Sequence, residues 1–278
     1  MRQNSEKDDF IYDSVPYPSF VFPQTHPDRL ATLGRLFGIE TSSPANCRML
    51  ELGCGDGSNI ISHAYSIGNG LFLGIDLSSV EISTGNSIIS KIGVTNLELR
   101  HADVTTLDPR ELGKFDFIVA HGLFSWVPDP VRIAILSIYR DCLANDGIGY
   151  ISYNALPGCR IRQITSEMMK YHARSIPDPL EKVKAGKDGL TSIVNASETD
   201  SLYQAMLGLE LEQISERTPS NIFHDDFSSV NQPFYFHEFC TEIEKFDLSF
   251  VCEADPTDLL DLKVSPKGRE LWDELASD

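Results

Sequence analysis

The sequence lacks a hydrophobic run long enough to cross a membrane. No uninterrupted apolar stretch approaches the roughly 18 residues that a spanning helix needs. The first residues, MRQNSEKDDF, also lack the basic and then apolar pattern of a secretory signal. We therefore expect a cytoplasmic protein that does not associate with membranes.

Cysteine is sparse and scattered. None of the six cysteines forms a C-x-x-C pair, which disfavours both a structural zinc site and a disulfide framework. We expect no bound metal. With 41% hydrophobic and 23% charged residues, 15 Pro and 19 Gly, the chain has the composition of a globular protein and not of a collagen-like or disordered one.

Basic residues are few. The chain has 23 Lys and Arg against 41 Asp and Glu, a formal charge of −18. Binding to DNA or RNA needs cations that neutralise phosphates, so this balance argues against a nucleic-acid partner. It suits cationic ligands and basic polypeptides, although many proteins are acidic for solubility alone.

Short apolar runs alternate with helix-like stretches between residues 47 and 153. Runs joined by crossovers of about 20 residues predict a parallel sheet with helices on both faces, an α/β fold. We expect strands at residues 48–52, 71–75, 97–100, 115–120 and 149–153, and the clearest helix at 131–143.

Beyond residue 160 the apolar periodicity becomes helical. Asp178-Pro179 is a helix start signal, because proline suits the first turn. Other helices are expected at 161–172, 202–214 and 236–246, followed by a strand at 248–252 and a short helix at 266–276. We divide the chain into an N-terminal arm with a helix (1–46), a core (47–158), a helical region (159–246), and a late strand with C-terminal helices (247–278).

The most informative segment is the glycine-rich stretch MLELGCGDGSN at residues 49–59. An apolar strand runs into Gly53, Gly55 and Gly57, where the backbone can take positive φ and approach a ligand, and then into a helix. The spacing is G-x-G-x-G, unlike the G-x-G-x-x-G that binds a pyrophosphate. Glu51, just before the loop, suits a ligand with a positive amino group.

Two further acids follow the next two strands. Asp76 ends the second strand, where a carboxylate can accept both hydroxyls of a ribose. Asp103 follows the third strand and can accept from an adenine amino group, while Val104 offers its backbone N–H. Each acid alone is also typical of a helix cap or turn. At consecutive carboxyl ends of one sheet, they favour a nucleoside site.

This combination resembles the class I S-adenosylmethionine (SAM)-dependent methyltransferases, which have a Rossmann-like sheet. The resemblance implies SAM as cofactor, S-adenosylhomocysteine (SAH) as product, and an N-terminal arm and helix that cap the cofactor site. It implies these cofactor-binding residues: Tyr12, Glu51, Gly53, Cys54, Gly55, Gly57, Asp76, Leu77, Asp103, Val104, His121 and Gly122.

A narrower resemblance covers nearly the whole chain. The segments YDSVPYPS (12–19), PQTHPDRL (23–30), AHGLFSWVP (120–128), SYNALPG (152–158) and NQPFYFHEF (231–239) are similar to a bacterial subgroup with a helical methyltransferase regulatory domain. That subgroup includes rickettsial protein lysine methyltransferases, which implies a lysine side chain as acceptor. Two departures stand out. Phe124 replaces an expected tyrosine, so the pocket would lack one hydroxyl, and we expect the last antiparallel strand of this sheet to be absent.

Methyl transfer to an amine needs alignment and desolvation more than a strong base. His121 is the best titratable candidate, although a histidine at a strand end is more often a pocket wall. Aromatic rings suit a cationic sulfur or amine. The candidate catalytic residues are Tyr17, His121, Trp126, Tyr153 and Asn154.

Two other functions stay open. A small-molecule methyltransferase would use residues 160–245 as a lid over a closed cavity. A SAM-binding but catalytically inactive homologue would bind the cofactor without transfer. The sequence leaves the oligomeric state open.

Overall fold

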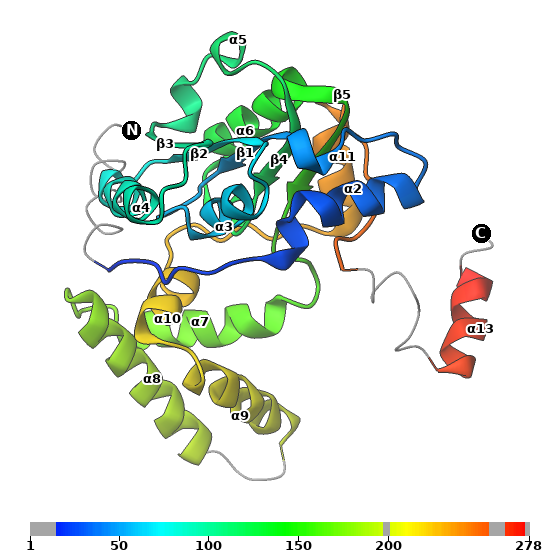
Figure 1. The fold of residues 1–278 in the computed structure, drawn as a ribbon. Coiled ribbons are helices and arrows are strands. Elements are labelled where there is room, and N and C mark those ends of the chain that lie inside the picture. Colours follow the sequence, from blue (N-terminus) through cyan, green and yellow to red (C-terminus); the bar gives the residue numbers. More distant parts are fainter. Residues whose placement is uncertain (1–14, 197–200, 256–264, 276–278) are drawn as a thin grey trace.

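The structure, a computed structural model, describes residues 15–196, 201–255 and 265–275. Its centre is a five-stranded sheet in the order β3-β2-β1-β4-β5, and all neighbouring strands are parallel (Figure 1). The strands are β1 (Arg48–Leu52), β2 (Leu71–Asp76), β3 (Leu97–His101), β4 (Phe115–Ala120) and β5 (Leu143–Ile151). The expected α/β architecture is confirmed.

The sheet is buried on both faces because its side chains alternate between two cores. Met49 of β1 packs in one core with residues of α2 (Pro27–Leu36), α3 (Ser58–Ser66) and α4 (Ser79–Ile92). Leu50 and Leu52 pack in the other core with α6 (Asp129–Cys142) and α11 (Phe236–Glu244). Because side chains on both faces of the central strands are buried, these strands consist of continuous apolar runs in the sequence.

Local signals start and end the crossover helices. The Ser78 hydroxyl accepts the N–H of Glu81 at the start of α4, and Gly93 ends that helix with φ 74°. Strand β5 begins at Leu143, earlier than the expected residue 149, and includes Asn145-Asp146-Gly147; its register against β4 is irregular between Phe115 and Phe117. Short helical segments complete the core: η1 (Pro23–Thr25), η2 (Pro44–Asn46), η3 (Val104–Thr106), α5 (Pro109–Leu112) and η4 (Phe124–Trp126).

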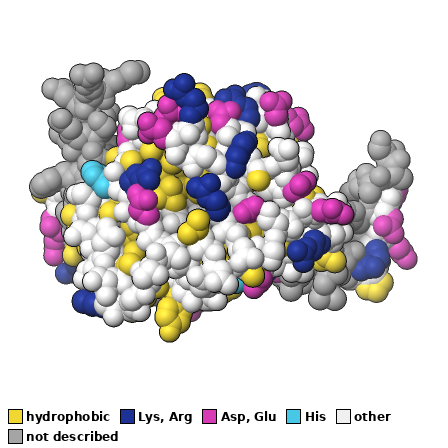
Figure 2. Space-filling view, turned by 45° about the horizontal axis from the view of Figure 1, so that its top comes forward, with side chains coloured by type: hydrophobic (Ala, Val, Ile, Leu, Met, Phe, Trp, Pro, Cys, Tyr) yellow, Lys and Arg dark blue, Asp and Glu magenta, His cyan; other side chains and the backbone are white. Residues whose placement is uncertain are grey.

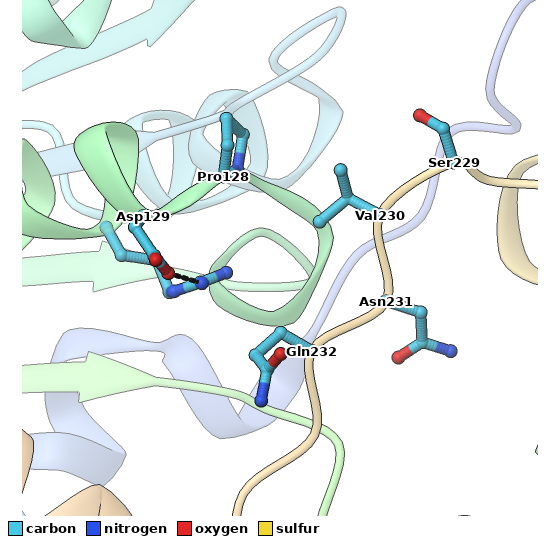
Figure 3. Close-up of a pocket in the computed structure, with 7 residues that line it drawn as sticks. Pro128, Asp129, Ser229, Val230, Asn231 and Gln232 are labelled. Carbon is cyan, nitrogen blue, oxygen red and sulfur yellow. Dashed lines mark hydrogen bonds and ion pairs between the residues drawn. The ribbon is translucent and has the colours of Figure 1, made fainter.

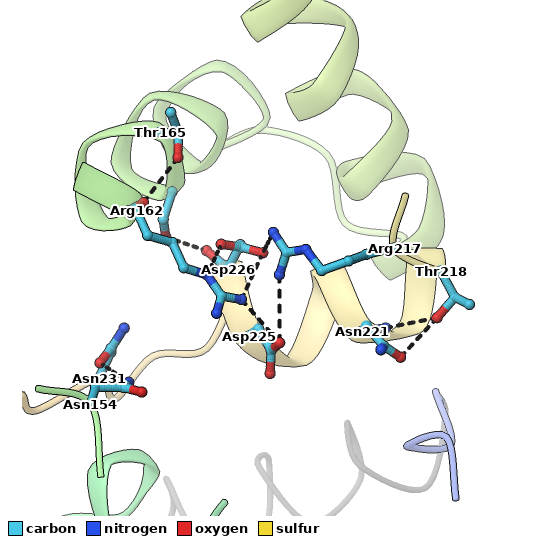
Figure 4. Close-up of polar contacts among 10 residues, drawn as sticks. Asn154, Arg162, Thr165, Arg217, Thr218, Asn221, Asp225, Asp226 and Asn231 are labelled. Carbon is cyan, nitrogen blue, oxygen red and sulfur yellow. Dashed lines mark hydrogen bonds and ion pairs between the residues drawn. The ribbon is translucent and has the colours of Figure 1, made fainter. Parts of the chain in front are cut away.

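A helical region with its own core lies beside the sheet (Figure 1). It consists of α7 (Arg160–His172), α8 (Pro179–Ala196), α9 (Leu202–Ser215) and α10 (Pro219–Asp226). The Asp226 carboxyl, 0% exposed, binds Arg162 Nε at 3.1 Å and Arg217 Nη2 at 2.8 Å (Figure 4). These ion pairs, with Asp226 buried at their centre, connect α7, α10 and the turn after α9. The sequence patterns did not predict α10.

The strand expected at 248–252 does not form. Leu248 N–H donates to the Ile243 carbonyl at the end of α11, and the Phe250 ring packs on Phe236 at 4.8 Å between centroids. These contacts hold the apolar run against α11, although α11 itself packs on the sheet. A last helix, α13 (Pro266–Leu275), follows.

None of the helices in the described ranges combines the length and apolarity needed to cross a membrane. On the face in Figure 2, basic side chains lie among acidic ones, so the net negative charge is not gathered there into one patch.

Candidate functional site

The loop after β1 is shaped by its three glycines. Gly53, Gly55 and Gly57 have φ angles of 70°, 56° and 77°, a region that other residues rarely adopt. A Cβ at Gly57 would lie 2.8 Å from a methyl carbon of Leu99, whereas a Cβ at Gly55 would meet no atom within 4 Å. The loop is therefore tightly packed at Gly57 and open at Gly55, which leaves room for a ligand against the backbone of Gly55.

Asp76 connects this loop to the end of β2. Its Oδ2 accepts the N–H of Gly55 and its Oδ1 accepts the N–H of Ser78, both at 2.8 Å. Burial raises the pKa of the Asp76 carboxyl, and the N–H groups of Ser78 and Gly55 oppose that rise. Each carboxyl oxygen keeps a lone pair that can accept a further hydrogen bond.

Glu51 is a buried acid in the floor of the site. It is 3% exposed, and its Oε1 accepts from Asn59 Nδ2 at 2.8 Å. Its Oε2 has no hydrogen-bond partner among the described residues. Burial raises the pKa of Glu51 to about 8. A buried carboxyl oxygen without a partner fits a cationic group such as the ammonium of an amino acid moiety.

His121 stands at the end of β4, between two aromatic rings. The Phe22 ring lies 3.7 Å from it between centroids, and Tyr150 Oη is 3.1 Å from His121 Nδ1. Burial lowers the pKa of His121 to about 4, so the ring is neutral at pH 7. The next residue, Gly122, donates its N–H to Ser152 Oγ at 2.7 Å, and a Cβ there would meet nothing within 4 Å.

The remaining expected cofactor residues lie along the same edge of the sheet. Asp103 is exposed, and its Oδ1 caps η3 by accepting the N–H and hydroxyl of Thr105 at 2.8 and 2.7 Å. Val104 packs partly into the core. Leu77 is 51% exposed, whereas Cys54 is buried. Tyr12 lies outside the described residues.

The candidate catalytic residues occupy varied surroundings. Tyr17 is 44% exposed and lies edge-on to His224 of α10, with centroids 5.3 Å apart. Trp126, in η4, is half-buried. Tyr153 stacks on Phe239 at 4.2 Å, and burial raises its pKa to about 12.

Asn154 and Phe124 contact residues around the loop after β4. Asn154 N–H donates to Ser125 Oγ at 2.8 Å, and its Nδ2 donates to Asn231 Oδ1 at 2.9 Å (Figure 4). Phe124 is 1% exposed, with its ring 5.5 Å from Phe234 in the core. The expectation of a missing pocket hydroxyl at Phe124 is therefore wrong, because this side chain points into the core.

A polar hollow lies beside the same loop. It is formed where the start of α6 faces the segment 229–232, with Asp129 and Arg132 paired on its wall (Figure 3). Its lining is Pro128, Asp129, Arg132, Ser229, Val230, Asn231 and Gln232.

Several residues of the site were not predicted from the sequence. Thr25 is fully buried against Asn59 and His63 of α3, and Ser19 donates its hydroxyl to Asp56 at the start of α3. Burial lowers the pKa of His63 to about 4. These partners are 34 to 38 residues apart, so no local pattern could have paired them.

Two family profiles match the chain. The family described as "Methyltransferase domain" matches residues 49–147. The family described as "Predicted methyltransferase regulatory domain" matches residues 218–278.

Similar proteins are found in Rickettsia. Two uncharacterized proteins of Rickettsia prowazekii are each 35% identical: one over 92% of this chain and 46% of its own length, the other over 84% and 94%. The structure of PKMT2 from Rickettsia typhi in complex with AdoHcy (SAH) superposes with a TM-score of 0.85 at 30% identity, over 94% of this chain and 50% of that one. The chain spans about half the length of the first relative and of PKMT2. With its glycine loop, parallel sheet and two matching families, the chain belongs to the class I SAM-dependent methyltransferases that carry a methyltransferase regulatory domain.

Proposed function

We propose that this protein transfers a methyl group from SAM to the side-chain amine of a lysine in a protein. The observation that supports SAM binding is the buried Oε2 of Glu51, which has no hydrogen-bond partner among the described residues and lies beside an open glycine loop. The lysine acceptor is supported by the likeness to PKMT2, which extends over 94% of this chain.

The residues of the site fit SAM. Glu51 would hold the ammonium group of its methionine part, and the backbone at Gly55 and Gly122 leaves space for the rest of that chain. Asp76 would accept the ribose hydroxyls with its remaining lone pairs, and Asp103 and Val104 would bind the adenine. When bound, SAM supplies a methyl group activated by a cationic sulfur.

The protein's part in the chemistry is to make the acceptor amine neutral and to align it. A lysine side chain, whose pKa in water is about 10.4, costs about 4.6 kcal/mol to deprotonate at pH 7. A low-dielectric pocket disfavours the ammonium form and lowers that cost. His121 has a pKa of about 4, far too low to take the proton from an ammonium efficiently. We therefore assign His121 as an aromatic wall of the pocket, together with Phe22.

The helical region is a suitable place for acceptor selection, because the N-terminal segment joins it to the cofactor loop. His224 Nε2 contacts the Val15 carbonyl at 2.6 Å, and Ser220 of the same helix donates to the Pro16 carbonyl. A few residues later, Ser19 reaches Asp56. We propose that α7 to α10 select the acceptor.

Transfer of a labelled methyl group tests this function. The 278-residue chain would be incubated with methyl-labelled SAM and lysine-rich proteins, followed by acid hydrolysis and separation of methylated lysines. We expect label in methyl-lysine, and its loss in an Asp76→Asn control. Label in another residue or in a small molecule would contradict the lysine assignment. SAH binding without transfer to any acceptor would contradict catalysis while leaving the cofactor site intact.

A further inference from the structure

We propose that Asn59 is a positioning residue of the cofactor site, which aims the Glu51 carboxyl and fastens the N-terminal segment 19–25 over the glycine loop. This inference rests on the proposed binding of SAM by Glu51. Asn59 lies in the first turn of α3, directly after the loop, and is 4% exposed.

Both polar atoms of the Asn59 amide, Nδ2 and Oδ1, have two hydrogen-bonding partners each. Its Nδ2 donates to Glu51 Oε1 at 2.8 Å and to Thr25 Oγ1 at 3.0 Å. Its Oδ1 accepts the N–H of Phe22 at 2.9 Å and lies 3.3 Å from Thr25 Oγ1. One side chain therefore connects the acid of β1 to Phe22 and Thr25, which precede Asn59 by 37 and 34 residues.

The donors and acceptors allow only one orientation of this amide. The N–H of Phe22 can only donate, so it must face Oδ1. The opposite group, Nδ2, then faces the carboxyl oxygen of Glu51, which stabilises its ionised form. An aspartate at position 59 would keep the acceptor for Phe22 and lose the donor for Glu51. Asn is thus the residue type that serves both partners.

The fastened segment reaches the pocket itself. Phe22, whose N–H is held by Asn59, places its ring on His121 with centroids 3.7 Å apart. Ser19 of the same segment binds Asp56, which also accepts the N–H of Ser58 at the start of α3. Loss of the Asn59 amide would release both the acid and the aromatic wall of the cofactor site.

The groups around Glu51 make this donor important. The charge of Asp76, at the end of β2, adds to the rise in the pKa of Glu51, and Glu51 in turn raises the pKa values of Cys54 in the loop and Tyr139 in α6. Asn59 is the only side chain in the described part of the chain that donates a hydrogen bond to the Glu51 carboxyl. Its removal should move the titration of Glu51 to higher pH.

Calorimetric titration with SAH at pH 6 to 9 tests the proposal on Asn59→Ala and the isosteric Asn59→Asp. We expect each variant to bind SAH at least tenfold more weakly than wild type at pH 7.5. In Asn59→Ala, the rise of affinity with pH should shift by about one unit to higher pH. Amide hydrogen exchange, measured without any ligand, should become faster in residues 19–25 of Asn59→Ala.

Asn96→Ala is the matched control. The Asn96 amide donates to the carbonyls of Ala64, Ile67 and Gly70 at the far end of α3. This variant should lose thermal stability but keep the SAH affinity and pH profile within twofold.

The outcomes distinguish the positioning role of Asn59 from the proposed function of the whole site. Wild-type affinity and pH profile in a folded Asn59→Asp variant would overturn the positioning role, and so would unchanged exchange in residues 19–25 of Asn59→Ala. Failure of the wild-type chain to bind SAH would instead overturn the proposed function, whatever the variants do.

Discussion

The raised pKa of Glu51 makes the affinity for SAH depend on pH. Only the ionised carboxyl can pair with the ammonium of the ligand, so binding favours deprotonated Glu51 and releases its proton. With a pKa of about 8, about 1% of this carboxyl is ionised at pH 6 and about 9% at pH 7, while the ligand amine, which belongs to a free amino acid, stays protonated over this range. Affinity should therefore rise about ninefold from pH 6 to pH 7.

The rise should then slow. Between pH 7 and pH 8 we expect a further gain of about fivefold, and above about pH 9 a fall as the ligand amine loses its proton. At pH 7 the net release on binding should be about 0.9 proton, visible as a dependence of the calorimetric heat on the ionisation enthalpy of the buffer.

Glu51→Gln and Glu98→Gln provide the comparison. Glu51→Gln should bind more weakly and lose the rise below pH 8, because no carboxyl titrates. Glu98 is exposed and pairs with Arg100 on β3, so its variant should keep the wild-type profile. A wild-type affinity that is flat from pH 6 to pH 8, or an unchanged profile in Glu51→Gln, would refute the assignment of Glu51 to the ligand amine.

Four other changes test separate parts of the structure. Asp76→Ala should weaken SAH binding by roughly 1.5–3 kcal/mol, the scale of lost charge-assisted hydrogen bonds, and an unchanged calorimetric affinity would remove the ribose assignment. Trp126→Ala should reduce the turnover of labelled SAM more than SAH affinity, and equal losses would place the ring in cofactor binding or folding. Asp226→Ala should lower the free energy of unfolding in urea by about 1.5–3 kcal/mol, since Arg162 and Arg217 lose a buried partner but keep Asp225. A loss below about 1 kcal/mol would mean that water replaces the carboxylate. The pKa of His63 is about 4 in the folded protein, against an ordinary value of 6.5. As the pH falls from 7 to 5, His63 is therefore protonated in the unfolded state but not in the folded one, and the free energy of unfolding should decrease by up to about 2 kcal/mol. In His63→Gln most of this pH dependence should disappear.

Local patterns were sufficient for much of the core. Strands β1 and β4 begin and end where their apolar runs do, at Arg48–Leu52 and Phe115–Ala120. The glycine loop and Asp76 were also predictable, since G-x-G-x-G after a strand and an acid at the next strand end are contiguous signals. Such features depend on backbone conformation and burial of neighbouring residues, which a short window of sequence contains.

The predictions from the sequence were wrong where contacts between distant residues determine the structure. The apolar run at 248–252 has the composition of a strand, but its side chains pack on α11 and it pairs with no strand in the described part of the chain. Phe124 follows a strand end like a pocket residue, yet Phe234 and Phe239 enclose its ring. Helix α10 (Pro219–Asp226) is short, and its polar residues are satisfied by Arg162 and Arg217, which lie on other elements.

The sequence by itself determined that the chain forms a parallel sheet with a glycine loop and acids at its carboxyl edge, because those features follow from local backbone preferences and strand periodicity. Only the tertiary structure decided what completes the site. Asn59 meets Phe22 and Thr25 across 34 to 37 residues of sequence. The pKa of Glu51 likewise depends on burial under these contacts, and burial is a property of the packed molecule.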